Sequence, residues 1–210
     1  YGLTKGQYSP TSEVGMKTKS SPYGTVARPF SALSMALGSE TTFVARTVDT
    51  ETHHLQEMVS RMAQHKGSAI LEIYQNCPVF NDGVFEDVKE RSVKLDHLVF
   101  LEQGELLVYG ADKSRVLKLD PKRMRLFASQ NGDDAEGVDI RHDERAPDGT
   151  LAFLLSRCGP PELPTPIGVF HAVEQPTFNE LTRAQEDEDR ERHGPGTLQD
   201  LIYAGDLWEV

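Results

Sequence analysis

The sequence has 210 residues, 38% of them hydrophobic, and carries a formal net charge of -11 at pH 7. A chain of this length can bury a sizeable core, as one domain or as one domain with an appendage. The acidic balance opposes binding to nucleic-acid phosphates, and no apolar run approaches the roughly 18 residues of a membrane helix, so we expect neither partner and take the cytoplasm as the default location.

The chain opens on an irregular segment, residues 1–28, that is rich in glycine, serine, threonine and lysine. Its charged side chains are four cations and one carboxylate: Lys5, Lys17, Lys19, Arg28 and Glu13. Glycine lets a backbone approach a ligand closely, and amides, hydroxyls and lysines suit phosphate oxygens. The segment therefore predicts a loop that binds an anion, with an ordinary irregular connection as the alternative. Because the sequence does not start with Met, we also expect a longer or processed precursor.

A strand, a helix and a second strand are expected next, after a short helix at residues 30–38. Residues 42–48 have the β-branched and apolar character of a buried strand. Asp49 or Thr50 would cap the following helix. The apolar face of that helix is formed by Leu55, Met58, Val59, Met62 and Ala63. Residues 68–74 complete a pattern that predicts a parallel pair of strands with a right-handed crossover.

Short apolar runs and turn signals replace this pattern in the second half of the chain. Residues 97–101, 105–109 and 115–119 each predict a short strand. With the first half, they predict an α/β fold with a mostly parallel sheet and a small β-rich appendage towards the C-terminus. The aromatic side chains expected in the core are Phe43, Phe80, Phe85, Phe100 and Phe127.

Further segments are expected at the surface. Residues 131–149 are acidic and rich in turn formers, which predicts a loop, and the prolines of residues 158–166 predict a stiff linker. Residues 178–192 predict a charged, solvated helix, and residues 198–202 a final amphipathic turn. The histidines expected as ordinary surface side chains are His53, His54 and His65.

Cys77 lies in the segment 75–83, directly after the second predicted strand. Ligands of open parallel sheets bind beyond the carboxyl ends of the strands, so this segment is expected near the chemistry. The residues leave three roles open for Cys77: a buried inert thiol, a nucleophile, or a ligand of an iron–sulfur cluster. A cluster needs four thiolates, and this chain has only Cys77 and Cys158. We expect no disulfide between them.

Five blocks of the sequence together resemble one enzyme family. The blocks are YGLTKGQYSPTS at residues 1–12, TKSSPYG at 18–24, FVAR at 43–46, QNCPVFN at 75–81 and GDLW at 205–208. In them the chain is similar to the β subunits of thiamine-diphosphate-dependent 2-oxoacid:ferredoxin oxidoreductases, above all those that act on 2-oxoglutarate. The resemblance implies that residues 1–84 form the second half of a thiamine-diphosphate-binding domain and that residues 85–210 form a C-terminal extension.

The resemblance also implies roles for the opening loop. Thiamine diphosphate would be contacted by Tyr1, Gly2, Leu3, Thr4, Gly6 and Gln7, with Thr4 on the diphosphate. Lys5 stands where relatives that act on pyruvate carry glycine, so it is a candidate for the distal carboxylate of 2-oxoglutarate. Magnesium (Mg2+) would be held by a Gly-Asp-Gly segment and an asparagine that this chain lacks. We expect no catalytic acid or base in this chain, because the cofactor carries the chemistry.

An electron path and several partners follow from the same resemblance. Cys77 would be the last of four ligands to a [4Fe-4S] cluster, with the other cysteines outside this chain. An α subunit would complete the active site, ferredoxin would accept electrons, and 2-oxoglutarate and coenzyme A would be substrates. The implied reaction is oxidative decarboxylation of 2-oxoglutarate to succinyl-CoA and carbon dioxide. Two alternatives remain: a relative that acts on pyruvate or another 2-oxoacid, and a non-catalytic subunit or docking fragment.

Overall fold

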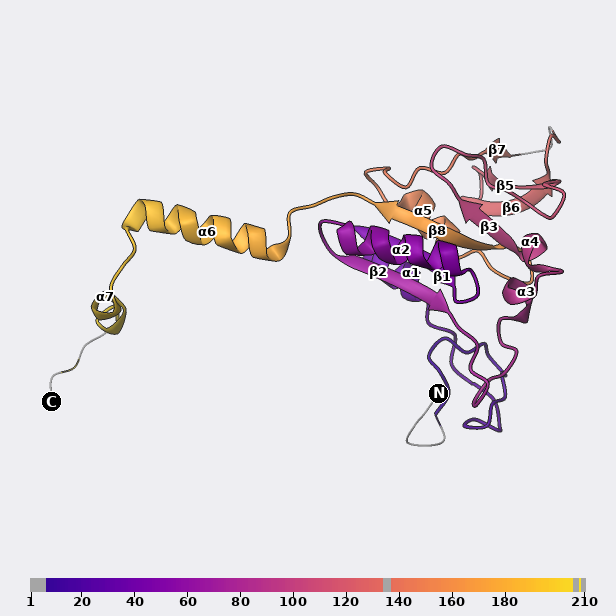
Figure 1. The fold of residues 1–210 in the computed structure, drawn as a ribbon, viewed down its shortest axis with the longest axis horizontal. Coiled ribbons are helices and arrows are strands. Elements are labelled where there is room, and N and C mark those ends of the chain that lie inside the picture. The colour runs from indigo at the N-terminus through magenta and orange to yellow at the C-terminus, as the bar shows by residue number, and fades with distance from the viewer. Residues whose placement is uncertain (1–6, 134–136, 206–207, 209–210) are drawn as a thin grey trace. The chain divides into compact units, whose positions relative to one another are not determined.

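The computed structural model describes residues 7–133, 137–205 and 208 of the chain (Figure 1). The chain divides into two units, Tyr1–Glu174 and Gln175–Val210. The first unit contains two four-stranded sheets with helices packed against them, and the second contains two helices.

The main sheet has the strand order β2-β1-β8-β3. Its strands are β2 (Ala69–Tyr74), β1 (Phe43–Val48), β8 (Thr165–Ala172) and β3 (Leu98–Leu101). β1 is parallel to β2 and β3 is parallel to β8, whereas β1 and β8 are antiparallel. The predicted α/β fold with a mostly parallel sheet is therefore confirmed. β3 and β8 come after residue 84 in the sequence, yet they belong to the same sheet as β1 and β2. The division into two domains at residue 84 stays a prediction.

Helix α2 (Thr52–Gln64) is the crossover between β1 and β2. All six residues of β1 are buried, as the apolar run predicts, and Met58 of α2 packs with Phe43 and Ala45 of the strand. The expected cap was wrong, because α2 begins after Glu51. The amide of Glu51 donates to the carbonyl of Val48 at 3.0 Å, so a tight turn separates the strand from the helix.

The opposite face of the main sheet is covered by α1 (Ala32–Gly38) and α5 (Thr150–Ser156). Leu33 of α1 and Leu155 of α5 are fully buried and share a cluster with Val44 of β1. Because neighbouring residues of a strand point to opposite faces, Val44 and its neighbours on β1 serve two different cores. A strand covered on both sides is expected to be largely apolar, and four of the six residues of β1 are apolar, the exceptions being Arg46 and Thr47.

The second sheet is antiparallel and lies in the same unit. Its strands are β4 (Val108–Tyr109), β5 (Arg115–Asp120), β6 (Arg125–Gln130) and β7 (Val138–Asp139), with β4 and β7 both paired to β5. Two single-turn helices, α3 (Glu86–Lys89) and α4 (Lys94–His97), precede β3. Buried leucines of the second sheet join the cluster beneath α1 and α5. The β-rich part expected from the sequence is confirmed, although β6 was not predicted.

The predictions for two of the expected surface segments were partly wrong. Residues 131–149 include β7 and two buried side chains, His142 and Glu144. The supposed linker contains buried Cys158 and runs into β8, where Pro166 is paired with Val99. Proline near the start of a strand is tolerated because few ladder hydrogen bonds are needed there. Of the aromatic side chains expected in the core, Phe43 is fully buried and the others are partly exposed.

The second unit, Gln175–Val210, contains α6 (Phe178–His193) and α7 (Leu198–Ile202). The first turn of α6 is closed by a capping box in which Thr177 and Glu180 bond each other's backbone amides. α6 buries none of its side chains, so the prediction of a charged and solvated helix is confirmed. Among the described residues, no helix has both the length and the apolar character needed to cross a membrane.

Candidate functional site

Residues 75–83, hereafter the cysteine loop, follow the carboxyl end of β2. Cys77 is partly exposed in this loop and forms no disulfide. The amide of Asn81 donates to the carbonyl of Cys77 at 2.9 Å, which closes a turn around the thiol. Backbone amides, first that of Phe80, lower the pKa of the Cys77 thiol below its ordinary value. Amide donors stabilise a thiolate, which is the form that binds metal.

The cysteine loop is braced at its far end by an asparagine. The side-chain amide of Asn76 donates to the carboxylate of Asp82 at 2.7 Å, and its carbonyl oxygen accepts from the amide of Gly83 at 2.9 Å. Gly83 has φ 82°, a conformation that favours glycine. The loop therefore has a defined shape that presents Cys77.

Residues 7–31, hereafter the opening loop, are irregular apart from single turns. Hydroxyl side chains are buried inside it: Ser12, Thr18, Ser20, Ser21 and Thr25. The hydroxyls of Thr18 and Ser21 lie 2.7 Å apart, and the amide of Gly15 donates to the carbonyl of Thr25 at 2.7 Å. A side chain at Gly24 would meet the carbonyl oxygen of Gly15 at 3.0 Å, so this close approach requires glycine.

The two loops meet (Figure 1), although the contacting residues Met16 and Asn81 are 65 positions apart in the sequence. The side-chain amide of Asn81 lies 3.2 Å from the sulfur of Met16. The opening loop is held to itself by the amide of Phe30, which donates to the carbonyl of Pro10 at 2.7 Å. The structure therefore brings together the two segments that sequence analysis singled out.

Most of the predicted cofactor contacts lie outside the described residues. This applies to Tyr1, Gly2, Leu3, Thr4, Lys5 and Gly6. Gln7 is described and its side chain is exposed. The roles of these residues towards thiamine diphosphate and the substrate stay predictions.

Arg46, inside β1, received no role from the sequence, yet it forms a buried cluster. It is 4% exposed, and its Nε donates to the carboxylate of Glu72 on β2 at 2.6 Å. The guanidinium lies 4.9 Å from the ring centre of Tyr74, which in turn stacks on Phe85. Burial raises the pKa of the Tyr74 phenol. A charged residue inside an otherwise apolar strand was the signal that could have revealed this cluster.

The second cysteine is unsuited to metal binding. Cys158 is 6% exposed, and burial raises the pKa of its thiol to about 12. Within the described part of the chain, no three histidine, cysteine or acidic side chains gather in a way that could hold a metal ion. Of the two thiols, Cys77 is therefore the better suited to bind a metal ion.

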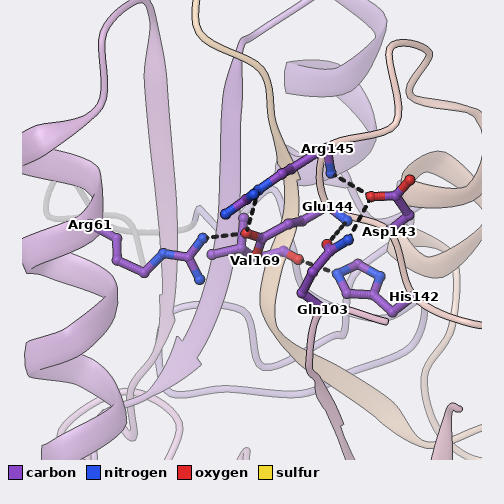
Figure 2. A network of polar contacts seen from close by, with 7 residues as sticks. All are labelled: Arg61, Gln103, His142, Asp143, Glu144, Arg145 and Val169. Atoms are coloured by element: carbon purple, nitrogen blue, oxygen red, sulfur yellow. Dashed lines mark hydrogen bonds and ion pairs between the residues drawn. The ribbon is translucent and has the colours of Figure 1, made fainter. Parts of the chain in front are cut away.

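A second polar cluster, also missed from the sequence, lies where the second sheet joins the main sheet (Figure 2). We call it the Glu144 network. The buried carboxylate of Glu144 accepts from Arg61 of α2 at 2.7 Å, and the amide of Glu144 donates to Gln103 at 2.8 Å. His142 lies 2.7 Å from the carbonyl oxygen of Val169 on β8, and its burial lowers the pKa of the imidazole. The network ties α2 and β8 to the segments that follow β3 and β7.

Comparisons with known proteins identify relatives of this chain. The sequence matches no protein-family model. It is 40% identical over 214 residues to the 2-oxoglutarate oxidoreductase subunit KorB of Mycobacterium tuberculosis. This alignment covers 100% of this chain and 56% of that protein. It is also 40% identical over 97 residues to a 2-oxoacid:ferredoxin oxidoreductase subunit beta of Saccharolobus solfataricus, covering 46% of this chain and 32% of that protein.

A solved structure supports the fold. The 2-oxoglutarate:ferredoxin oxidoreductase from Magnetococcus marinus, with 2-oxoglutarate, coenzyme A and succinyl-CoA bound, superposes with a TM-score of 0.60 at 24% identity. The match covers 97% of this chain and 54% of that chain. The chain thus spans about half the length of the relatives that it matches along its whole sequence. On sequence similarity, this chain belongs to the β subunits of the 2-oxoacid:ferredoxin oxidoreductases.

Proposed function

We propose that the chain is part of the β subunit of an enzyme that oxidatively decarboxylates 2-oxoglutarate to succinyl-CoA and carbon dioxide. Two electrons leave each substrate molecule, pass through a [4Fe-4S] cluster and reduce two molecules of ferredoxin. The observation that carries the proposal is the 40% identity along the whole chain to a protein named as a 2-oxoglutarate oxidoreductase subunit.

In this proposal the segment at residues 1–7, which leads into the opening loop, binds the diphosphate of the cofactor. Thiamine diphosphate supplies an electron sink for loss of carbon dioxide when it is bound. Gly2, Leu3, Thr4, Gly6 and Gln7 lie against the cofactor, and Tyr1 precedes them. The buried hydroxyls and the close approach of Gly15 and Gly24 farther along the loop support this role, because they fix the backbone that follows the contact residues.

Lys5 recognises the distal carboxylate of 2-oxoglutarate. An ammonium group pairs with a carboxylate as a point charge, and pyruvate has no second carboxylate for it to meet. The pair therefore favours 2-oxoglutarate over pyruvate by differential binding. Magnesium is held by residues that this chain does not contain.

Cys77 is one of the four cluster ligands. The partial exposure of its sulfur and the amides that lower its pKa support this role, because hydrogen bonds to sulfur also tune the potential of a cluster. The other three thiolates come from outside this sequence, and an α subunit completes the active site. Ferredoxin docks where it can receive electrons from the cluster.

The experiment is turnover by the complete enzyme, rebuilt with all its subunits, on a panel of 2-oxoacids. We expect coenzyme-A-dependent reduction of ferredoxin with 2-oxoglutarate and little with pyruvate. Preference for pyruvate or a branched 2-oxoacid would show that the proposed substrate is wrong and that the proposed class of reaction is right. Absence of turnover on every acid, in an enzyme that retains its cofactors, would leave the chain a non-catalytic subunit.

A further inference from the structure

A surface pocket of about 510 Å3 lies at the amino end of α2, on residues to which the proposed reaction assigns no role. Its walls come from the turn after β1, the first turn of α2, and the segment that contains α3 and α4. The ionisable side chains that line it are Glu51, His53, His54, Lys89, Arg91 and Lys94. Pockets of a few hundred Å3 suit ligands of nucleotide size.

The charge of this pocket is not balanced. Lys89 is paired with Asp49 at 2.8 Å, and Lys94 is paired with Glu51. Among the described residues, no carboxylate lies within ion-pair distance of Arg91, which is exposed at the wall. The two ion pairs hold the lysines in place, and the guanidinium of Arg91 is the cation left over. A guanidinium binds phosphate with two parallel hydrogen bonds.

Neutral donors surround the same space. The hydroxyls of Thr50 and Thr52 line the pocket, and no side chain caps the amides at the start of α2, which has 13 residues. Burial lowers the pKa of His54, which keeps its imidazole neutral near pH 7, and this ring lies 2.7 Å from the hydroxyl of Thr47. His53 adds an exposed aromatic ring. The pocket therefore combines one surplus cation with donors and an aromatic surface.

We propose that this pocket binds a phosphate-bearing ligand of nucleotide size, with Arg91 on the phosphate. The ligand is either a free nucleotide or, if the proposed function holds, the nucleotide end of coenzyme A. Both present the same chemistry, a phosphate monoester on an adenosine. The position at the carboxyl end of β1 suits either ligand, because open parallel sheets bind ligands at this edge.

The test is calorimetric titration of the complete enzyme with adenosine 3′,5′-bisphosphate and, separately, with adenosine monophosphate. We expect Arg91→Gln to weaken binding by on the order of tenfold, the loss of one charge-assisted contact. Arg125→Gln is the matched control, since Arg125 is exposed on β6 and does not line the pocket. Its affinity should equal that of the unmodified enzyme.

Each outcome decides the proposal. Loss of affinity in Arg91→Gln alone supports it, and tighter binding of the bisphosphate than of the monophosphate then identifies coenzyme A as the source. Equal or tighter binding of the monophosphate identifies a free nucleotide. Equal affinity in all three proteins, equal weakening in both variants, or no binding of either probe overturns the proposal. Because no turnover is measured, failure of the proposed reaction does not affect the result.

Discussion

The cysteine loop and the Glu144 network are both polar, yet their polar groups differ in exposure and in pairing. In the cysteine loop, the sulfur of Cys77 is partly exposed and faces backbone amides. In the Glu144 network, the carboxylate of Glu144 is buried and already paired with Arg61. A paired and buried group contributes to stability, whereas an accessible group with donors around it remains available to a ligand.

This contrast predicts that substitutions in the two regions separate function from stability. Changes at the cysteine loop should alter the spectrum or turnover and leave the melting temperature nearly unchanged. Changes in the Glu144 network should lower the melting temperature and leave the spectrum of the folded enzyme unchanged.

The largest expected effect is loss of the cluster in Cys77→Ser. A serine hydroxyl does not ionise near neutral pH, so the substitution would remove the proposed fourth thiolate ligand. We expect the complete β subunit to lose its visible [4Fe-4S] absorbance and its ability to reduce ferredoxin. The control is Cys158→Ala, which removes a buried thiol and should retain the absorbance. An intact spectrum in Cys77→Ser would make Cys77 a structural thiol.

Glu144→Ala should give the largest loss of stability. It removes the buried partner of Arg61, whose side chain is 35% exposed and can be solvated again. We expect the free energy of unfolding to fall by about 2 kcal/mol, which lowers the melting temperature by roughly 4–8 °C. Calorimetry on the complete β subunit measures this.

The matched control is Glu188→Ala, which breaks an exposed ion pair with Arg192 on α6. Exposed pairs within a helix contribute little, so its melting temperature should not change. Equal melting temperatures for Glu144→Ala and the unmodified protein would show that the network is not a source of stability.

Lys5→Ala should produce a smaller effect, confined to substrate recognition. Without the ammonium group, the KM for 2-oxoglutarate should rise on the order of tenfold, while the KM for pyruvate stays the same. The melting temperature should be unchanged. Lys17→Ala, at an exposed position in the opening loop that follows, is the matched control. Equal losses for both acids would remove Lys5 from recognition of the distal carboxylate.

Local patterns in the sequence were sufficient for the crossover and for the position of the cysteine loop. The apolar run of β1, the amphipathic face of α2 and the run of β2 lie close together in the chain, and their order predicts a parallel pair. Because ligands bind beyond the carboxyl ends of such strands, the sequence predicts that the cysteine loop lies near the chemistry.

Long-range pairing could not be predicted from these patterns. β8 enters the main sheet between β1 and β3, although a proline-rich run precedes it and the helix before that run, α5, was not predicted. The partners of the Glu144 network come from positions 61, 103 and 142–144, and nothing local marks them as neighbours. Glu144 and His142 were expected at the surface because residues 131–149 are acidic and rich in turn formers, and charged residues are rarely buried unless they are paired.

The smallest expected effect is the dependence of stability on the pH around His142. Burial is the main cause of its lowered pKa, and the charges nearby are Glu144, Asp143 and Arg61. The unfolded chain, with the ordinary value of 6.5, therefore binds a proton at a higher pH than the folded protein does. Stability contributed by the neutral imidazole is present above that value and is lost as the pH falls below it.

Melting temperatures between pH 5 and pH 8 measure this loss in the complete β subunit. The imidazole lies 2.7 Å from the carbonyl of Val169 and has a buried nitrogen, Nδ1, with no hydrogen-bond partner among the described residues. Protonation would place an uncompensated charge at that nitrogen, so the melting temperature should fall more steeply below pH 6.5 than in His142→Gln. Glutamine keeps a donor for the carbonyl and does not titrate. Identical pH profiles for the two proteins would therefore assign the acid sensitivity to other histidines with a lowered pKa, such as the partly exposed His54.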